Sequence, residues 1–192
     1  VEAFEAHLSR HDPVVCNWVQ GVVVHHTDKP SISQWQATGG QQYMESLGRF
    51  YRWKRGWPAG PHLFIGPDGI WQGTPMNIPG IHAGNANPVT IGIEVVGNYN
   101  DAPWQEPIKG FVYGVLVSLL RWLDLDETRI TGHNQWMTTD CPGRAINIDT
   151  VHTNVKGLLQ AQRKPKQETC GYTVHNPICG PVLAPFSLVA FI

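Results

Sequence analysis

Short apolar runs rich in β-branched residues alternate along this chain with longer stretches in which apolar residues recur at helical spacing. Residues 22–25 and 90–96 are typical of central, buried strands, because apolar side chains dominate both segments. The helical pattern covers residues 41–54, 105–125 and 148–162. Strands and helices that interleave in this way predict an α/β fold with a mixed central β-sheet flanked by helices.

Two further segments complete the expected sheet. Residues 62–65 and 70–72 flank the sequence GPDG at 66–69, and a Pro-Asp-Gly turn between two apolar runs predicts a hairpin. Residues 129–133 predict a short strand that ends at a histidine. The sheet is therefore expected to contain both parallel and antiparallel neighbours.

The pattern changes at both ends of the chain. Residues 1–20 show little periodicity, so we expect an irregular N-terminal segment before a single domain at residues 21–162. Residues 163–192 are broken by Pro and Gly, which predicts a linker and a short C-terminal extension. Cys170 and Cys179 bracket a short loop in this extension and can close a local disulfide in an oxidising compartment.

The composition excludes two classes of function. Across 192 residues, 14 Lys and Arg stand against 15 Asp and Glu, a formal net charge of −1 at pH 7. A chain so balanced does not hold nucleic acid mainly by charge, so no nucleic-acid partner is expected. The chain has no run of about 18 consecutive apolar residues, so no membrane span is expected either.

Two of the nine histidines and one cysteine lie at or just after strand ends. These are His25, His133 and Cys141. Imidazole and thiolate are ligands that Zn²⁺ prefers, and three protein ligands leave a position for water in a hydrolytic site. Two alternatives stay open: core histidines beside a cysteine that acts as a small apolar residue, and a structural zinc site closed by His26 or His82.

A set of segments in a fixed order carries a family resemblance. The segments are VVVHHT at 22–27, PAGPHLFIGPDG at 58–69, IHAG at 81–84, IGIEVVG at 91–97 and GH…TDCPG at 132–143. Together they make residues 20–160 similar to the zinc-dependent N-acetylmuramoyl-L-alanine amidases of type 2. Phage lysozyme-amidases, bacterial autolysins and animal peptidoglycan recognition proteins share this family.

The resemblance implies a Zn²⁺ ion held by His25, His133 and Cys141. Where two histidines are adjacent, the first ligand of the family is the earlier one, so the resemblance implies His25. Neighbouring residues of a strand point to opposite faces, so His25 and His26 are not both expected to be ligands. The domain at 21–162 is then a single catalytic domain, and the reaction needs no organic cofactor.

The resemblance also implies two catalytic side chains. Glu94 corresponds to the general base of bacterial relatives, which takes a proton from the attacking water; a solvated position on the strand is its alternative. Thr139 corresponds to a residue that hydrogen-bonds the developing oxyanion; a loop hydroxyl that caps the backbone is its alternative. Phage relatives carry a catalytic tyrosine before the hairpin histidine, whereas this chain has Pro61, so a tyrosine-dependent mechanism is excluded.

The reaction that the resemblance implies is hydrolysis of the amide bond between N-acetylmuramic acid and L-alanine in peptidoglycan. The muramyl peptide is the expected partner of a monomeric protein. Packing or hydrogen bonding inside the fold is the alternative for each residue expected to bind it. These residues are His26, His62, His82, Asn85 and Trp57.

A non-catalytic peptidoglycan-recognition module of the same fold is the main alternative function. Loss of a zinc ligand would mark such a module, and none is lost here. A zinc peptidase that acts on other amides is a further alternative, distinguishable by its products. We expect the protein to be secreted or to act at the cell envelope, and the roles of phage endolysin, autolysin and antimicrobial immune effector all remain open.

Overall fold

The computed structural model describes residues 1–161 and 189–191, and its centre is a mixed β-sheet. The strands are β1 (Gly21–His26), β2 (Leu63–Gly66), β3 (Gly69–Gln72), β4 (Thr90–Val95), β5 (Ile130–Gly132) and β6 (Val189–Phe191). They lie in the order β5-β1-β4-β2-β3-β6. β1 is parallel to β4 and β5, and β2 is parallel to β4, whereas β3 is antiparallel to β2 and β6. The predicted α/β class with a mixed sheet is confirmed.

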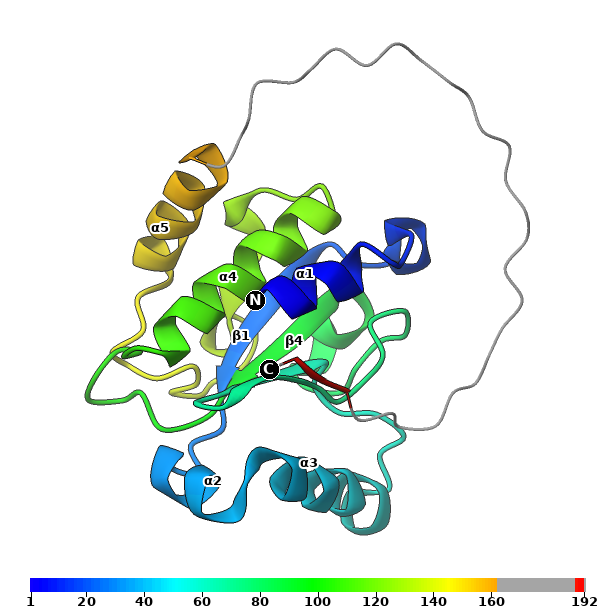
Figure 1. Cartoon of the computed structure of the whole chain (residues 1–192), viewed down its shortest axis with the longest axis vertical. Helices are drawn as coiled ribbons and strands as arrows, with labels where there is room; N and C mark the ends of the chain where they lie inside the picture. The colour runs from blue at the N-terminus through cyan, green and yellow to red at the C-terminus, as the bar shows by residue number, and fades with distance from the viewer. Residues whose placement is uncertain (162–188, 192) are drawn as a thin grey trace.

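Helices cover both faces of this sheet. They are α1 (Glu2–Leu8), α2 (Ile32–Thr38), α3 (Gly40–Arg49), α4 (Ile108–Trp122) and α5 (Ile148–Ala161), and a π-helical segment (Phe50–Arg55) continues α3. Figure 1 shows α1 and α4 on one side of the sheet and α2 and α3 on the other. Among the described helices, none combines the length and the apolar character that crossing a membrane requires.

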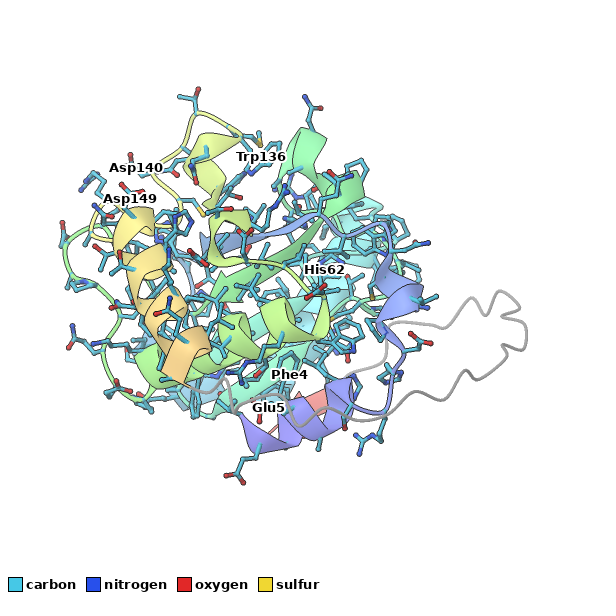
Figure 2. The ribbon with its side chains drawn as sticks, turned by 90° about the horizontal axis from the view of Figure 1, so that it is seen from above. Phe4, Glu5, His62, Trp136, Asp140 and Asp149 are labelled. Carbon is cyan, nitrogen blue, oxygen red and sulfur yellow. The ribbon has the colours of Figure 1, made fainter. Side chains whose placement is uncertain are left out.

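The expectation of an irregular N-terminal segment is wrong for residues 2–8, which form α1. Phe4 and Leu8 lie on one face of this helix and are buried in the main core, where α4 also packs. Figure 2 shows Phe4 on the side of α1 that faces the body of the molecule. The spacing of these two apolar residues was the signal for a helix, but the segment is short and otherwise polar.

The other element boundaries differ from expectation by a few residues. α4 begins at Ile108, directly after Pro107. Proline has no backbone N–H, so Pro107 cannot donate the hydrogen bond that would extend the helix toward the N-terminus of the chain. α2 was not expected; its N-terminus is a capping box in which Ser31 and Gln34 satisfy each other's backbone N–H groups. The predicted extension, with Cys170 and Cys179, lies outside the described residues except for β6.

Strand alternation gives the two faces of the sheet different roles. Val22, Val24, Ile91 and Ile93 belong to the core cluster that also contains the buried side of α4. Val23 and Gly92, which lie between them in sequence, face the opposite side, where Val23 packs with Ala83 and Ala86 and Gly92 lies against the His82 ring. His25 on β1 is the register partner of Glu94 on β4. Because β1, β4 and β5 are parallel, their carboxyl ends meet at one edge, where open α/β sheets place their ligands.

Candidate metal centre and cleft

Three potential metal ligands gather at the carboxyl ends of the central strands. His25 is near the end of β1, His133 follows β5 directly, and Cys141 lies in the loop after it. One donor atom from each lies within 4.8 Å of the other two. The Sγ atom of Cys141 is 3.6 Å from Nδ1 of His25. The structure thus brings together the three residues that the sequence suggested as ligands.

This donor set fits Zn²⁺. With metal–ligand distances of about 2.1 Å to nitrogen and 2.3 Å to sulfur, tetrahedral geometry separates neighbouring ligand atoms by about 3.6 Å. The Cys141–His25 separation already has this value. Burial raises the pKa of the Cys141 thiol to about 12, although a backbone hydrogen bond from His26 opposes the shift. A divalent cation is the partner that would favour the thiolate in this place.

Neither candidate for a fourth ligand completes a closed site. Within the described residues, the metal-binding group contains His25, His133 and Cys141 and no other side chain. His26 accepts a hydrogen bond from the Tyr99 N–H at Nδ1, and the Nδ1 atom of His82 faces Nε2 of His25 at 3.1 Å. Three protein donors are the number that leaves a position for water in hydrolytic zinc sites.

Backbone geometry holds the Cys141 loop against β1. The His26 N–H donates to Cys141 Sγ at 3.3 Å, and the Cys141 N–H donates to the Thr139 hydroxyl at 3.2 Å. Gly143 has φ of +113°, and a Cβ there would lie 2.4 Å from the Tyr99 carbonyl oxygen. These hydrogen bonds hold the Cys141 thiol next to β1. Only glycine fits at position 143, in the turn that follows.

Glu94 lies on the same face of the sheet as His25. Its Oε2 atom is buried and has no hydrogen-bond partner among the described residues. Burial raises the pKa of this carboxyl group to about 8. Glu94 as a whole is half-buried and one of its oxygens is out of reach of solvent, so it does not occupy the solvated face considered from the sequence. A buried carboxylate oxygen without a partner is costly.

A cleft of roughly 510 Å³ opens beside Glu94 and His133. Its walls come from the π-helical segment and the residues after it, from the loop before β4, and from the residues that follow β5. The lining residues are Phe50, Tyr51, Arg55, Trp57, Pro61, Ile81, His82, Gly84, Asn87, Glu94, His133 and Met137. Phe50 and Met137, 43% and 50% exposed, give its rim an apolar character suited to sugar or peptide.

The predicted substrate-binding residues have separate positions. Trp57 and His82 line the cleft, whereas His26 lines a smaller adjoining pocket of roughly 150 Å³ that also reaches Glu94. Asn85 is exposed and is not among the residues that line the cleft. Its neighbour Asn87 lines the cleft instead and also accepts backbone hydrogen bonds from the loop.

The prediction that His62 binds substrate is wrong. Its side chain is fully buried, and Figure 2 shows it in the interior of the molecule. Nδ1 accepts a hydrogen bond from the Gly92 N–H at 3.0 Å, and Nε2 lies 3.1 Å from the Ile78 carbonyl oxygen. Burial lowers the pKa of His62 to about 3, so this residue is a neutral link between loop and strand.

Tyr51 is a cleft residue that the sequence reasoning missed. It was assigned to the packing face of a helix, yet it lines the cleft together with Glu94. No hydrogen-bond partner of its hydroxyl occurs in the part of the chain that the structure describes. Burial and, next, the Glu94 carboxylate raise the pKa of Tyr51. Pro61 stands where phage relatives carry a catalytic tyrosine, but a different tyrosine, Tyr51, lines the cleft of this chain. Pro61 alone therefore does not rule out a tyrosine in the cleft.

The place of Tyr51 depends on the loop that follows the π-helical segment. Its ring is stacked on Trp57 with centroids 5.7 Å apart. A Cβ on Gly60 would lie 2.6 Å from the Tyr51 ring, so the glycine makes room for it. The run Gly-Trp-Pro-Ala-Gly at 56–60 was the available signal, because glycines outside a regular turn often mark a close approach.

Comparisons with known proteins identify the family that this chain resembles. A family model described as N-acetylmuramoyl-L-alanine amidase matches residues 16–144. The chain is 30% identical over 135 residues to peptidoglycan-recognition protein SC1a of Drosophila melanogaster, covering 68% of this chain and 71% of that protein. It is 31% identical over 138 residues to an N-acetylmuramoyl-L-alanine amidase of Homo sapiens, covering 68% of this chain and 23% of that protein.

A solved structure is also similar to this chain in its fold. A variant of Drosophila PGRP-LB in complex with tracheal cytotoxin aligns with a TM-score of 0.58 and 25% sequence identity. The alignment covers 68% of this chain and 80% of that protein.

Proposed function

Because this chain belongs to the N-acetylmuramoyl-L-alanine amidase family, we propose that it hydrolyses the amide bond between N-acetylmuramic acid and L-alanine in peptidoglycan. The observation that carries the proposal is the donor set of His25, His133 and Cys141 together with Glu94, the register partner of His25, one of whose oxygens is buried without a hydrogen-bond partner. A module that only recognises peptidoglycan needs neither feature.

Zn²⁺ bound by the three donors would lower the pKa of a water molecule and polarise the scissile carbonyl group. Glu94 would accept the proton of the attacking water and return it to the amine of the leaving L-alanine. The pKa of Glu94, raised to about 8 by burial, lies near neutrality, where a carboxylate can both accept and return a proton.

Thr139 and Tyr51 would contact the reacting amide from two sides. The Thr139 hydroxyl accepts from the Cys141 N–H, which leaves its own proton free for the developing oxyanion. Tyr51 lines the cleft with a hydroxyl that can hydrogen-bond the substrate. In this proposal Thr139 would combine the two roles that the sequence left open.

The muramyl peptide would occupy the cleft between Trp57 and Met137. Binding of tracheal cytotoxin by the similar Drosophila structure supports a ligand of this class. The net charge of −1 means that attachment to the wall relies on specific contacts in the cleft. A protein that acts on this substrate would be secreted or would act at the cell envelope.

Recognition without hydrolysis is the second candidate function, because similar chains include proteins named for peptidoglycan recognition. Purified peptidoglycan separates the two when it is incubated with the protein, with and without a chelator, and the new termini are identified by mass spectrometry. Hydrolysis predicts free L-alanine amino termini and intact lactyl groups, lost with chelator and restored by Zn²⁺. Bound wall fragments without any cleavage by the zinc-loaded protein would support recognition alone.

Among the residues that the structure describes, Cys16 and Cys141 are both buried and provide a matched pair for this assay. Cys141→Ser should lose zinc and cleavage together, because serine is a poor zinc ligand. Cys16→Ser should keep both, since the Cys16 thiol lies beside the Met76 carbonyl oxygen and away from the cluster. Equal losses in both variants would contradict the assignment of Cys141.

A further inference from the structure

His82 lines the cleft, but its two ring nitrogens are already engaged inside the protein. Nε2 lies 3.2 Å from the Thr90 carbonyl oxygen. A carbonyl oxygen only accepts hydrogen bonds, so Nε2 of His82 must carry the proton. In the neutral ring Nδ1 is then an acceptor.

The acceptor nitrogen of His82 determines the state of His25. Nε2 of His25 is 3.1 Å from Nδ1 of His82, and the two rings meet edge to face at 89°. Because His82 accepts there, Nε2 of His25 must donate and carries the proton. Nδ1 of His25 is left with a free lone pair, and this atom lies 3.6 Å from Cys141 Sγ.

We propose that His82 is a positioning residue, which fixes the tautomer and the ring orientation of His25 so that Nδ1 of His25 is presented to the metal. The inference rests on the proposed metal site and assigns His82 a role other than substrate binding. Outer hydrogen-bond partners of this kind orient metal-ligating histidines and raise their basicity.

Two features of the fold hold His82 in this place. Its backbone N–H and that of Ala83 both donate to Oδ1 of Asn87, at 2.9 and 2.7 Å. A Cβ on Gly92 would lie 2.5 Å from Cγ of His82, so only glycine in the middle of β4 lets the ring lie over the strand. A glycine within an apolar strand often marks such a close approach.

His62 provides the internal control. It is also a buried histidine, its ring centroid is 5.7 Å from that of His82, and both of its nitrogens bond to backbone groups. Neither nitrogen faces His25. If burial of a histidine near the site were all that mattered, His62 and His82 would be equivalent.

The first test needs no variant and no activity. Long-range ¹H–¹⁵N correlation spectra of the metal-free protein report which imidazole nitrogens carry protons. We expect His25 and His82 both to be protonated at Nε2 and not at Nδ1. A proton on Nδ1 of His25 would overturn the proposal, and this outcome says nothing about whether the protein cuts peptidoglycan.

The second test measures zinc affinity by competition with a chromogenic chelator for folded variants. His82→Leu should weaken zinc binding by about 10- to 100-fold, which is the usual effect of losing such an outer partner. His82→Asn, which keeps an acceptor near the place of Nδ1, should recover most of the affinity. His62→Leu should bind zinc like the wild-type protein. Unchanged affinity in His82→Leu, or an equal loss in His62→Leu, would contradict the role of His82.

Discussion

Individual side chains at this site are explained by what lies next to them in space. His25 and Glu94 are register partners on β1 and β4, so the proposed base and the first proposed metal ligand share one sheet face. The tautomer of His25 depends on His82, which lies in the loop before β4 and has no sequence motif that marks this role. The proposed chemistry of the site therefore depends on pairs of residues that are far apart in sequence and adjacent in the fold.

Replacing Tyr51 tests its contact with the substrate. Tyr51→Phe should lower kcat/KM for peptidoglycan about tenfold, equivalent to about 1.4 kcal/mol, because one hydrogen bond to the bound substrate is lost. Zinc content should not change. Tyr113→Phe is the matched control, because the Tyr113 hydroxyl accepts from Asn154, outside the cleft lining. An equal rate in Tyr51→Phe and wild type would remove Tyr51 from the mechanism.

The secondary-structure elements show which parts of the fold the sequence can predict. Strands β1 and β4 were predictable because their apolar runs are continuous and bounded by turn residues. α1 and α2 span seven residues each, so their periodicity covers less than two turns and is weak. The exact role of a strand residue depended on register, which only the assembled sheet fixes.

The same contrast applies to the site residues: some carry a signal in the sequence, and others depend on contacts that only the folded chain makes. His25, His133 and Cys141 were predictable because the family resemblance and the strand ends agreed. The burial of His62 was not, since its partners Ile78 and Gly92 belong to separate segments of the chain. Tyr51 was missed because its pattern fits an ordinary helix, and only the approach of Gly60 turns it toward the cleft.

Gly92 tests the close approach within β4. Gly92→Ala should lower the free energy of unfolding by about 1–3 kcal/mol, because the new methyl group collides with the His82 ring. Zinc affinity should fall with it. Gly157→Ala on α5 is the control; open space surrounds its added Cβ, and helix propensity should raise stability by about 0.5–1 kcal/mol. Chemical denaturation of both variants provides the measurement, and a stable Gly92→Ala with normal zinc affinity would contradict the packing argument.

At the scale of the whole molecule, buried titratable groups set the pH range of stability. His62 has its pKa lowered to about 3 by burial, below the ordinary 6.5. Its contribution to stability is therefore complete above pH 6.5 and is lost as the pH falls toward 3, because only the unfolded chain takes up the proton. Glu94, with its pKa raised to about 8, has the opposite sign: its contribution falls as the pH rises from about 4.5 to 8.

The histidine effect can be isolated with a single variant. Between pH 6.5 and 5, the metal-free wild-type protein should lose about 2 kcal/mol through His62 alone, at about 1.4 kcal/mol per pH unit. His62→Asn keeps an acceptor for the Gly92 N–H and should show a shallower decline by that amount. Urea unfolding at the two pH values measures the difference, in which the Glu94 effect cancels. Parallel declines for the two proteins would show that His62 is protonated in the native state.

At the largest scale, the sheet edge that carries the proposed metal donors and the proposed base adjoins a cleft wall supplied by the π-helical segment. The proposed mechanism depends above all on Glu94, which would act as the base when the N-acetylmuramic acid–L-alanine bond is cleaved. The most direct test compares zinc-loaded wild type and Glu94→Gln on purified peptidoglycan, with free L-alanine amino termini counted by mass spectrometry. We predict release by the wild type, at least about 100-fold less by Glu94→Gln, and equal zinc content in both. Equal release by the two proteins, or none by the zinc-loaded wild type, would contradict the account.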